Sequence, residues 1–259
     1  MRAYWNVETA NLSMAGNYGW GFVKLEPLFG PPGEKFLVLD SDTVLAGPVL
    51  DVWNDSQAPF LVNDEKQSEA DTKRLYYDWE RAHAVDPCAQ PPHFVFNSGQ
   101  WFGTAGVLSR SDFAPWIEWT MPRRLRHPEV FMPGEQGILN YVLNQKVALE
   151  SLQVEPREIM RWPAHSMDGL DAQRVASRAA APLIAHWAGL KKARLKDMAG
   201  ADLLFFFEKQ YYRRFTSPEA RRVLAACRES LSYRAFDLKV WVSLAARRLS
   251  NLSRPTVSA

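Results

Sequence analysis

The stretch KFLVLDSDTVL, residues 35–45, runs an apolar segment directly into two aspartates, Asp40 and Asp42. A continuous apolar run of this length is typical of a strand that is buried on both faces of a sheet. Side chains at i and i+2 point to the same side while strand geometry persists. Both carboxylates could therefore face one point at the carboxyl end of the strand, where α/β sheets bind their ligands.

Two carboxylates this close repel each other unless a cation lies between them. Mg²⁺ and Mn²⁺ bind carboxylate oxygens readily, so the pair indicates a site for a divalent cation. The alternative is a polar turn after a strand, because Asp and Ser are ordinary turn residues.

Composition limits the class of protein. The 259 residues are 47% hydrophobic, enough for one large domain or for a domain with an appendage. The 31 basic and 29 acidic residues leave a net charge of +2. Nucleic-acid-binding proteins usually carry a large basic excess, so we expect no nucleic-acid partner.

The cysteines and the chain start bear on localisation. Cys88 and Cys227 are too few for a disulfide framework, which favours a reducing compartment. The first residues lack the pattern of a secretory signal, and the late apolar run LLFFF is far shorter than the roughly 20 residues of a membrane span. We therefore expect a cytoplasmic protein.

The order of predicted elements indicates an α/β domain over residues 1–199 and a helical extension over 200–259. Helices are predicted at 18–30, within 65–92 ahead of a long loop, at 111–121, at 134–145 with apolar residues on one side, and from 200 onward, with a new helix start at Ser217 and Pro218. Strands are predicted at 35–40, 59–64, on both sides of a turn within 93–103, at 147–154 and at 182–189.

Two further motifs carry polar groups at the ends of these elements. In FNSG, Gly99 permits a close approach of the backbone, and Asn97 offers a donor and an acceptor for a hydroxyl-rich ligand. A hairpin turn is the alternative. In GEQGILN, Glu135 and Gln136 open a helix, although acidic residues favour a helix start without any ligand.

The last motif, HWAGLKK, follows an apolar strand. The imidazole of His186 can complete a carboxylate metal site. Gly189 would let the backbone approach a phosphate, and Lys192 would supply a point charge for it. A half-buried histidine beside a solvated basic loop is the alternative.

Together these motifs resemble those of GT-A fold glycosyltransferases, most closely family eight, the glycogenin and lipopolysaccharide galactosyltransferase group. The resemblance covers roughly residues 18–193. LDSDTVL is similar to the metal-binding DxD element, FNSG to the sugar-contacting loop, and EQGILN to the element in which an acidic residue precedes Gln. HWAGLKK has the HxxGxxK spacing of the family. The family usually has Asp where Glu135 stands.

The resemblance implies a GT-A-like, Rossmann-like mixed sheet with helices on both faces. It also implies transfer of a sugar, with retention of configuration, from a nucleotide-diphosphate donor, expected to be a UDP-sugar, to an acceptor that the sequence does not identify. Asp40, Asp42 and His186 would hold Mn²⁺ or Mg²⁺, and Glu135 and Gln136 would be the catalytic residues. The donor-binding residues implied are Asp40, Asn97, Ser98, Gly99, Gly189 and Lys192.

The position of the DxD element departs from the family. Family members carry a nucleotide-binding strand–helix unit before it, whereas here it arrives at residue 40. We therefore expect a domain truncated at its N-terminus, with residues 35–39 at or next to a sheet edge and with weak binding of UDP.

Other functions stay open. A truncated, non-catalytic homologue or an incomplete reading frame would share these motifs. Haloacid-dehalogenase-type phosphohydrolases also end a strand with Asp-x-Asp, but they expect Gly and then Thr next, whereas Thr43 follows Asp42 directly. The C-terminal segment 232–255 mixes apolar and basic residues, so it could contact an anionic membrane or pack on the domain with its basic side in water.

Overall fold

The computed structural model describes residues 14, 18–120, 124–132, 134–189 and 193–252, with the backbone alone for residues 20 and 236–252. The chain divides into two compact units, one within residues 7–203 and the other comprising mainly residues 204–259. The larger unit contains the strands described below, and the smaller unit contains the C-terminal helices.

A four-stranded sheet organises the larger unit. Its order is β1 (Lys35–Leu39), β4 (Gln100–Thr104), β3 (Phe60–Asn63) and β7 (Val154–Arg157). β4 is antiparallel to both β1 and β3, whereas β7 is parallel to β3. The prediction of an α/β fold with a mixed sheet is therefore confirmed.

β1 lies at an edge of this sheet within the described part of the chain, as predicted for residues 35–39. The prediction that it is buried on both faces is wrong, because its residues are half-buried or exposed and Leu39 is 40% exposed. A strand with one neighbour leaves a row of backbone groups and part of its side chains uncovered.

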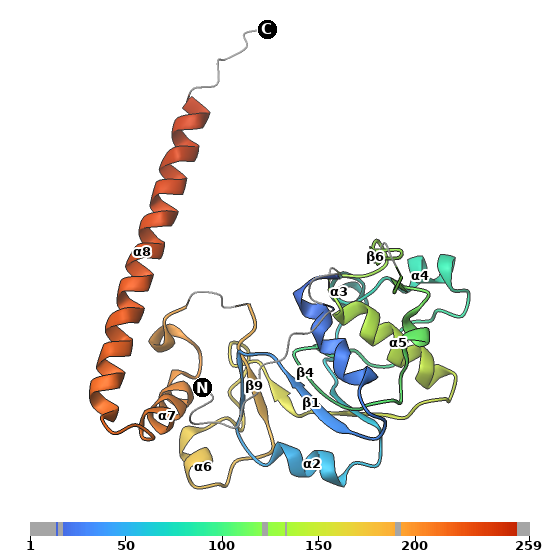
Figure 1. Cartoon of the computed structure of the whole chain (residues 1–259), viewed down its shortest axis with the longest axis horizontal. Coiled ribbons are helices and arrows are strands. Elements are labelled where there is room, and N and C mark those ends of the chain that lie inside the picture. Colours follow the sequence, from blue (N-terminus) through green and yellow to red (C-terminus); the bar gives the residue numbers. More distant parts are fainter. Residues whose placement is uncertain (1–13, 15–17, 121–123, 133, 190–192, 253–259) are drawn as a thin grey trace. The chain divides into compact units, whose positions relative to one another are not determined.

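Alternation along β3 gives the sheet two apolar faces. Phe60 and Val62 join a core with residues of η1 (Trp20–Phe29) and α5 (Gln136–Ala148), whereas Leu61 joins a second core with α2 (Val49–Asp55). Figure 1 shows α5 and α2 on opposite sides of the strands. Helices thus cover both faces, which explains why all four residues of β3 are buried.

A separate three-stranded sheet has the order β2 (Thr43–Leu45), β9 (Ile184–His186) and β8 (Met160–Arg161). β2 is antiparallel to β9, and Thr43 lies opposite His186. This register places the residue before Thr43, which is Asp42, next to His186.

Several predicted elements differ in the structure. Residues 65–92 hold two helices, α3 (Glu69–Leu75) and α4 (Trp79–Val85), rather than one helix and a long loop. The prediction of a helix at 111–121 is wrong. This region contains a short 3-10 helix, η2 (Arg110–Phe113), followed by strand β5 (Ile117–Glu118). Pro115 accounts for the change, because it has no N–H to continue a helix.

The region of α5 also differs. The helix continues to Ala148, so the strand predicted at 147–154 begins only with β7 at Val154. α5 is buried on every side between Gly137 and Asn144, and not on one side as predicted. The remaining elements of the larger unit are β6 (Arg124–Leu125), α6 (Ala172–Ala176) and η3 (Leu195–Asp197).

The strand predicted before the turn at 97–99 is absent, because side chains of α5 bind its backbone instead. Asn140 accepts a hydrogen bond from Phe96 N and donates one to Phe96 O, both at 2.9 Å. Asn144 likewise accepts from His93 N at 2.7 Å and donates to Phe94 O at 2.9 Å. These two asparagines, which we call the asparagine pair, satisfy the groups that a neighbouring strand would otherwise bind.

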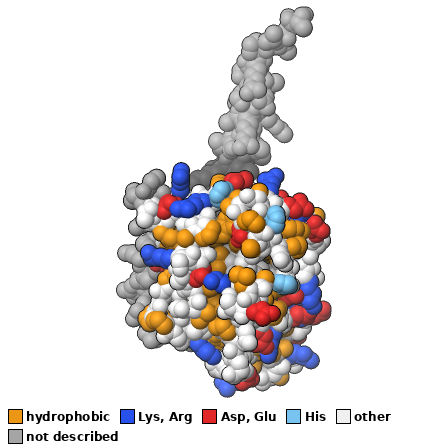
Figure 2. Space-filling view, turned by 90° about the vertical axis from the view of Figure 1, so that its right-hand side faces the viewer, with side chains coloured by type: hydrophobic (Ala, Val, Ile, Leu, Met, Phe, Trp, Pro, Cys, Tyr) orange, Lys and Arg blue, Asp and Glu red, His pale blue; other side chains and the backbone are white. Residues whose placement is uncertain are grey.

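The C-terminal region is helical, as predicted. α7 (Ala201–Tyr212) is followed by α8 (Pro218–Leu252), which starts at the predicted Pro218. Within the described residues, no helix is long and apolar enough to cross a membrane. Figure 2 shows acidic, basic and apolar side chains interspersed on one face of the molecule, so that face carries no patch of a single charge.

Candidate metal centre and ligand cavities

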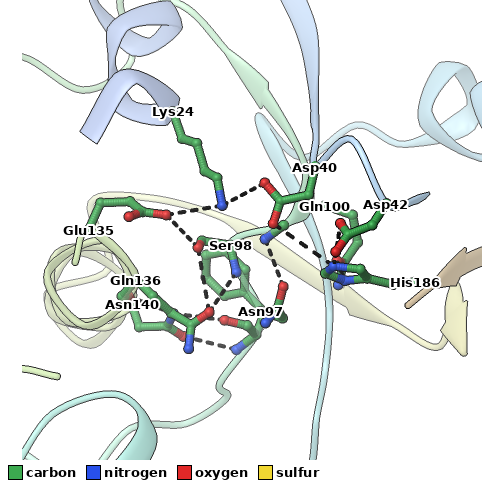
Figure 3. A network of polar contacts seen from close by, with 12 residues as sticks. Lys24, Asp40, Asp42, Asn97, Ser98, Gln100, Glu135, Gln136, Asn140 and His186 are labelled. Atoms are coloured by element: carbon green, nitrogen blue, oxygen red, sulfur yellow. Dashed lines mark hydrogen bonds and ion pairs between the residues drawn. The ribbon is translucent and has the colours of Figure 1, made fainter. Parts of the chain in front are cut away.

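Asp40, Asp42 and His186 form a cluster in which one ligand atom from each residue lies within 4.8 Å of the others. His186 Nε2 lies 3.3 Å from Asp42 Oδ1 and 3.9 Å from Asp40 Oδ2 (Figure 3). The prediction that these three residues converge is confirmed. Two carboxylates and an imidazole form a ligand set that can hold a metal ion.

A turn between β1 and β2, and not a continuous strand, brings the two aspartates together. Asp40 O accepts hydrogen bonds from Thr43 N and Thr43 Oγ1, at 3.2 and 2.7 Å. Trp187 N donates to Asp42 O at 3.0 Å, which ties the turn to the end of β9. The three side chains are therefore held by backbone contacts of both sheets.

The surroundings of His186 fit a cation. Its Nε2 is buried and makes no hydrogen bond, although it faces both carboxylates. Burial lowers the pKa of His186, and this effect outweighs Asp42 and Asp40, which raise the pKa. The imidazole is therefore neutral near pH 7. When Nδ1 carries the proton, the Nε2 lone pair points at two negative groups, an arrangement that a divalent cation would stabilise.

Gly99 makes room for this cluster. A Cβ atom at this position would lie 2.6 Å from Asp40 Oδ2 and would also collide with the His186 ring. The backbone of Gly99 is at the same time bound to the turn, because Asp40 N donates to Gly99 O at 2.7 Å. The close approach expected from the sequence is thus an approach to the metal-ligand side chains.

Lys24, on η1, is a site residue that sequence reasoning missed. Its ammonium lies 2.8 Å from Asp40 Oδ1 and 3.3 Å from Glu135 Oε1 (Figure 3), and its side chain is only 10% exposed. Ser98 Oγ donates to Glu135 Oε1 at 2.7 Å. The signal in the sequence is weak: a single lysine inside the largely apolar run GFVKLEPLF, which also contains Glu26.

Gln136 and Asn97 are both engaged with the backbone. Gln136 Oε1 accepts from Ser98 N at 3.1 Å, and its Nε2 donates to Leu75 O at 3.2 Å. Asn97 Oδ1 accepts from Gly99 N at 2.8 Å. These contacts fix the FNSG turn against the start of α5.

Two cavities lie on either side of Asn97 and Gln136. The first, of about 450 Å³, is lined by Lys24, Asp40 and Glu135 together with Asn97, Ser98 and Gln136. The second, of about 500 Å³, also borders Asn97 and Gln136, and it is lined on its other sides by residues that include His186, Trp162, Glu65 and Tyr76. Asp42 lines neither cavity, so it is Asp40 that shares a cleft with Asn97 and Gln136.

The second cavity has an aromatic wall. The Trp162 ring stacks on His186, with ring centroids 4.7 Å apart and an interplanar angle of 24°. Trp162 Nε1 donates to Glu65 Oε2 at 3.1 Å. Burial raises the pKa of Glu65, so a ligand in this cavity would meet a carboxyl group with an increased tendency to be protonated.

The two residues predicted to bind phosphate are Gly189 and Lys192. Gly189 lines neither cavity. Gly189 is exposed, has φ +82° and would leave an added Cβ in open space. Lys192 lies outside the described residues. The positive φ explains a glycine at residue 189 without any ligand.

Comparisons of this chain with protein-family models, with curated proteins and with solved structures found no match.

Proposed function

We propose that this chain is a metal-dependent glycosyltransferase of the GT-A type that uses a nucleotide-diphosphate sugar, with a UDP-sugar as the donor. The observation that carries the proposal is the cluster of Asp40, Asp42 and His186 at the border of a cavity lined by both charged and amide side chains. Cavities of this kind, with a few convergent polar groups, are typical of small-molecule sites.

Asp40, Asp42 and His186 would hold Mn²⁺ or Mg²⁺. Such an ion supplies positive charge that binds a diphosphate and stabilises its charge as it leaves. Glu135 and Gln136 would orient the donor sugar from the start of α5. Asn97 and Ser98 would border the same sugar from the FNSG turn. Lys24 would balance the carboxylates of the donor cavity.

The second cavity is suited to the acceptor. Asn97 and Gln136 line both this cavity and the donor cavity. An acceptor hydroxyl in the second cavity would therefore lie near the donor sugar, with these two side chains beside both substrates. The amphipathic ring of Trp162 offers an apolar contact to a sugar or a similar ring. A transferase needs such a pair of neighbouring sites, one for each substrate.

The rival phosphohydrolase assignment has less support. A phosphohydrolase of that type needs further acidic ligands for Mg²⁺, whereas the third member of the cluster is an imidazole. A homologue without activity could keep the same metal cluster and the same cavities. Only a measurement of turnover distinguishes it from an active transferase.

The test is release of UDP from a panel of UDP-sugars by the purified chain with Mn²⁺. We expect release that depends on metal and that Asp42→Asn abolishes, while Asp51→Asn, a control on the exposed side of α2, leaves it unchanged. Metal binding without turnover would favour a non-catalytic homologue. Hydrolysis of an aryl phosphate in place of UDP release would favour the phosphohydrolase and overturn the proposal.

A further inference from the structure

Gln100 is a buried polar residue behind the metal centre. It is the first residue of β4, and its side chain is 0% exposed. Its Oε1 lies 2.9 Å from His186 Nδ1 (Figure 3). Its Nε2 is buried and makes no hydrogen bond in the described part of the chain. A buried amide with an unpaired N–H is destabilising, so its presence at this position needs a reason.

The contact with Gln100 decides which nitrogen of His186 carries the proton. A neutral imidazole has one N–H and one lone pair. When Gln100 Oε1 faces Nδ1, the proton is on Nδ1 and the Nε2 lone pair is directed at Asp42 and Asp40. When the Gln100 NH₂ faces Nδ1 instead, the proton is on Nε2, which can then donate to Asp42 Oδ1, 3.3 Å away. Only the first arrangement leaves Nε2 able to bind a metal.

We propose that Gln100 is a positioning residue for the metal ligand His186, and that its amide rotates when the metal binds. With metal, Oε1 accepts the Nδ1 proton and Nε2 of His186 binds the ion. Without metal, the amide NH₂ donates to Nδ1 and His186 donates to Asp42. The inference rests on the proposed metal centre but not on sugar transfer.

The unpaired atoms support the two-state arrangement. With Oε1 toward Nδ1, both Gln100 Nε2 and His186 Nε2 lack partners. Rotation of the amide gives one Gln100 N–H the Nδ1 lone pair as its acceptor, so an unpaired carbonyl replaces one of the two unpaired N–H groups. It also puts the proton of the imidazole on Nε2, which lies 3.3 Å from Asp42 Oδ1. Unpaired carbonyls are tolerated better than unpaired N–H groups. A cation supplies the partner of His186 Nε2 in the other state.

A glutamine is suited to this task, because its amide presents either an acceptor or a donor to Nδ1 at the same position. A carboxylate would hold the proton on Nδ1 permanently, and an apolar side chain would not select a nitrogen at all. Partners of this kind orient metal-binding histidines, and their loss weakens metal affinity by about 10–100-fold.

The first experiment compares Mn²⁺ binding by calorimetry in the full chain and in Gln100→Met and Gln100→Glu. We expect Gln100→Met to bind Mn²⁺ about 10–100-fold more weakly. Its melting temperature in EDTA should change little, because the change removes one hydrogen bond to His186 Nδ1 together with the unpaired groups of the buried amide. Gln100→Glu should bind at least as tightly as the wild type. Gln145→Met, the same substitution on α5 away from both cavities, should bind like the wild type.

The second experiment follows the imidazole nitrogens of the wild-type protein by ¹⁵N NMR, with and without Mg²⁺. The His186 signals are identified by their loss in His186→Gln. We expect the proton on Nε2 without metal and on Nδ1 with saturating Mg²⁺. The same tautomer in both states would overturn the amide rotation.

The outcomes separate this inference from the proposed function. Unchanged Mn²⁺ affinity in Gln100→Met, or a loss of melting temperature that accounts for the weaker binding, would overturn the role of Gln100. A wild type that binds no Mn²⁺ would overturn the metal centre and Gln100 together. Failure to turn over any UDP-sugar, with these binding results as expected, would overturn only the transferase.

Discussion

The ammonium of Lys24 lies 2.8 Å from the Asp40 carboxylate, on the side of Asp40 that faces Glu135 and not His186. It reduces the repulsion in a region that gathers three carboxylates. Lys24 comes from η1 and Asp40 from the turn after β1. The ion pair therefore also ties these two elements to each other.

Replacement of Lys24 by Met should destabilise the metal-free protein. The change leaves the nearly buried Glu135 and the neighbouring Asp40 without their cation, at a cost of roughly 1–3 kcal/mol. Mn²⁺ should then raise the melting temperature of the variant more than that of the wild type, because it relieves the same repulsion. Lys66→Met, which breaks an exposed ion pair with Glu158, is the control and should change stability much less, because exposed ion pairs are screened by water. Equal effects of the two changes would contradict this role of Lys24.

Gly99→Ala should weaken Mn²⁺ binding. The new Cβ would stand 2.6 Å from Asp40 Oδ2 and would also meet the ring of His186, so at least one ligand has to move. We expect at least about a tenfold loss of affinity, measured by calorimetry. Gly30→Ala is the control, since φ is −74° and the nearest atom to its Cβ is 3.2 Å away. Wild-type affinity in Gly99→Ala would show that the ligands are not held as described.

The metal-free protein should lose stability as the pH falls below 6.5, the ordinary pKa of histidine. Burial lowers the pKa of His186, so below this pH the unfolded chain binds a proton that the folded chain does not. Denaturation in EDTA at a series of pH values would measure this slope. We expect it to be smaller in His186→Gln than in the wild type, and His165→Gln, which replaces an exposed histidine, is measured beside it. Identical slopes in all three proteins would exclude His186 as the source.

Asn140→Ala should destabilise the fold by roughly 1–3 kcal/mol, because Phe96 N and Phe96 O are then left buried without partners. Chemical denaturation gives the free energy of unfolding directly. Gln145→Ala, at a half-buried position on the same helix, should cost under about 0.5 kcal/mol. A loss of similar size in both variants would indicate that helix propensity, and not the contact with Phe96, is responsible.

The sequence predicted the features that depend on local pattern. An apolar run that ends in polar residues marks a strand end, and the ends of two such runs, at Asp40 and His186, do meet. The edge position of residues 35–39 within the described part of the chain agrees with the expectation from the sequence. Pro218 marked the start of α8 in the same way, through a local preference.

The features that could not be predicted from the sequence depend on contacts between residues that are distant in the chain. Phe94 and Phe96 lie in a run with a strand pattern, but their backbone groups bind Asn140 and Asn144, more than 40 residues later. Lys24 shows no motif, since its importance comes only from the two carboxylates that the fold brings to it. The tautomer of His186 depends similarly on Gln100, 86 positions earlier.

The asparagine pair also limits how the length of this chain can change in evolution. Asn140 and Asn144 are one helical turn apart, and the residues they bind, Phe96 and Phe94, are two positions apart in an extended segment. One residue inserted or deleted between Phe94 and Phe96, or between Asn140 and Asn144, would break this match at one of its two ends. Natural variants of this protein should therefore differ in length in the surface loops and keep both of these spacings constant.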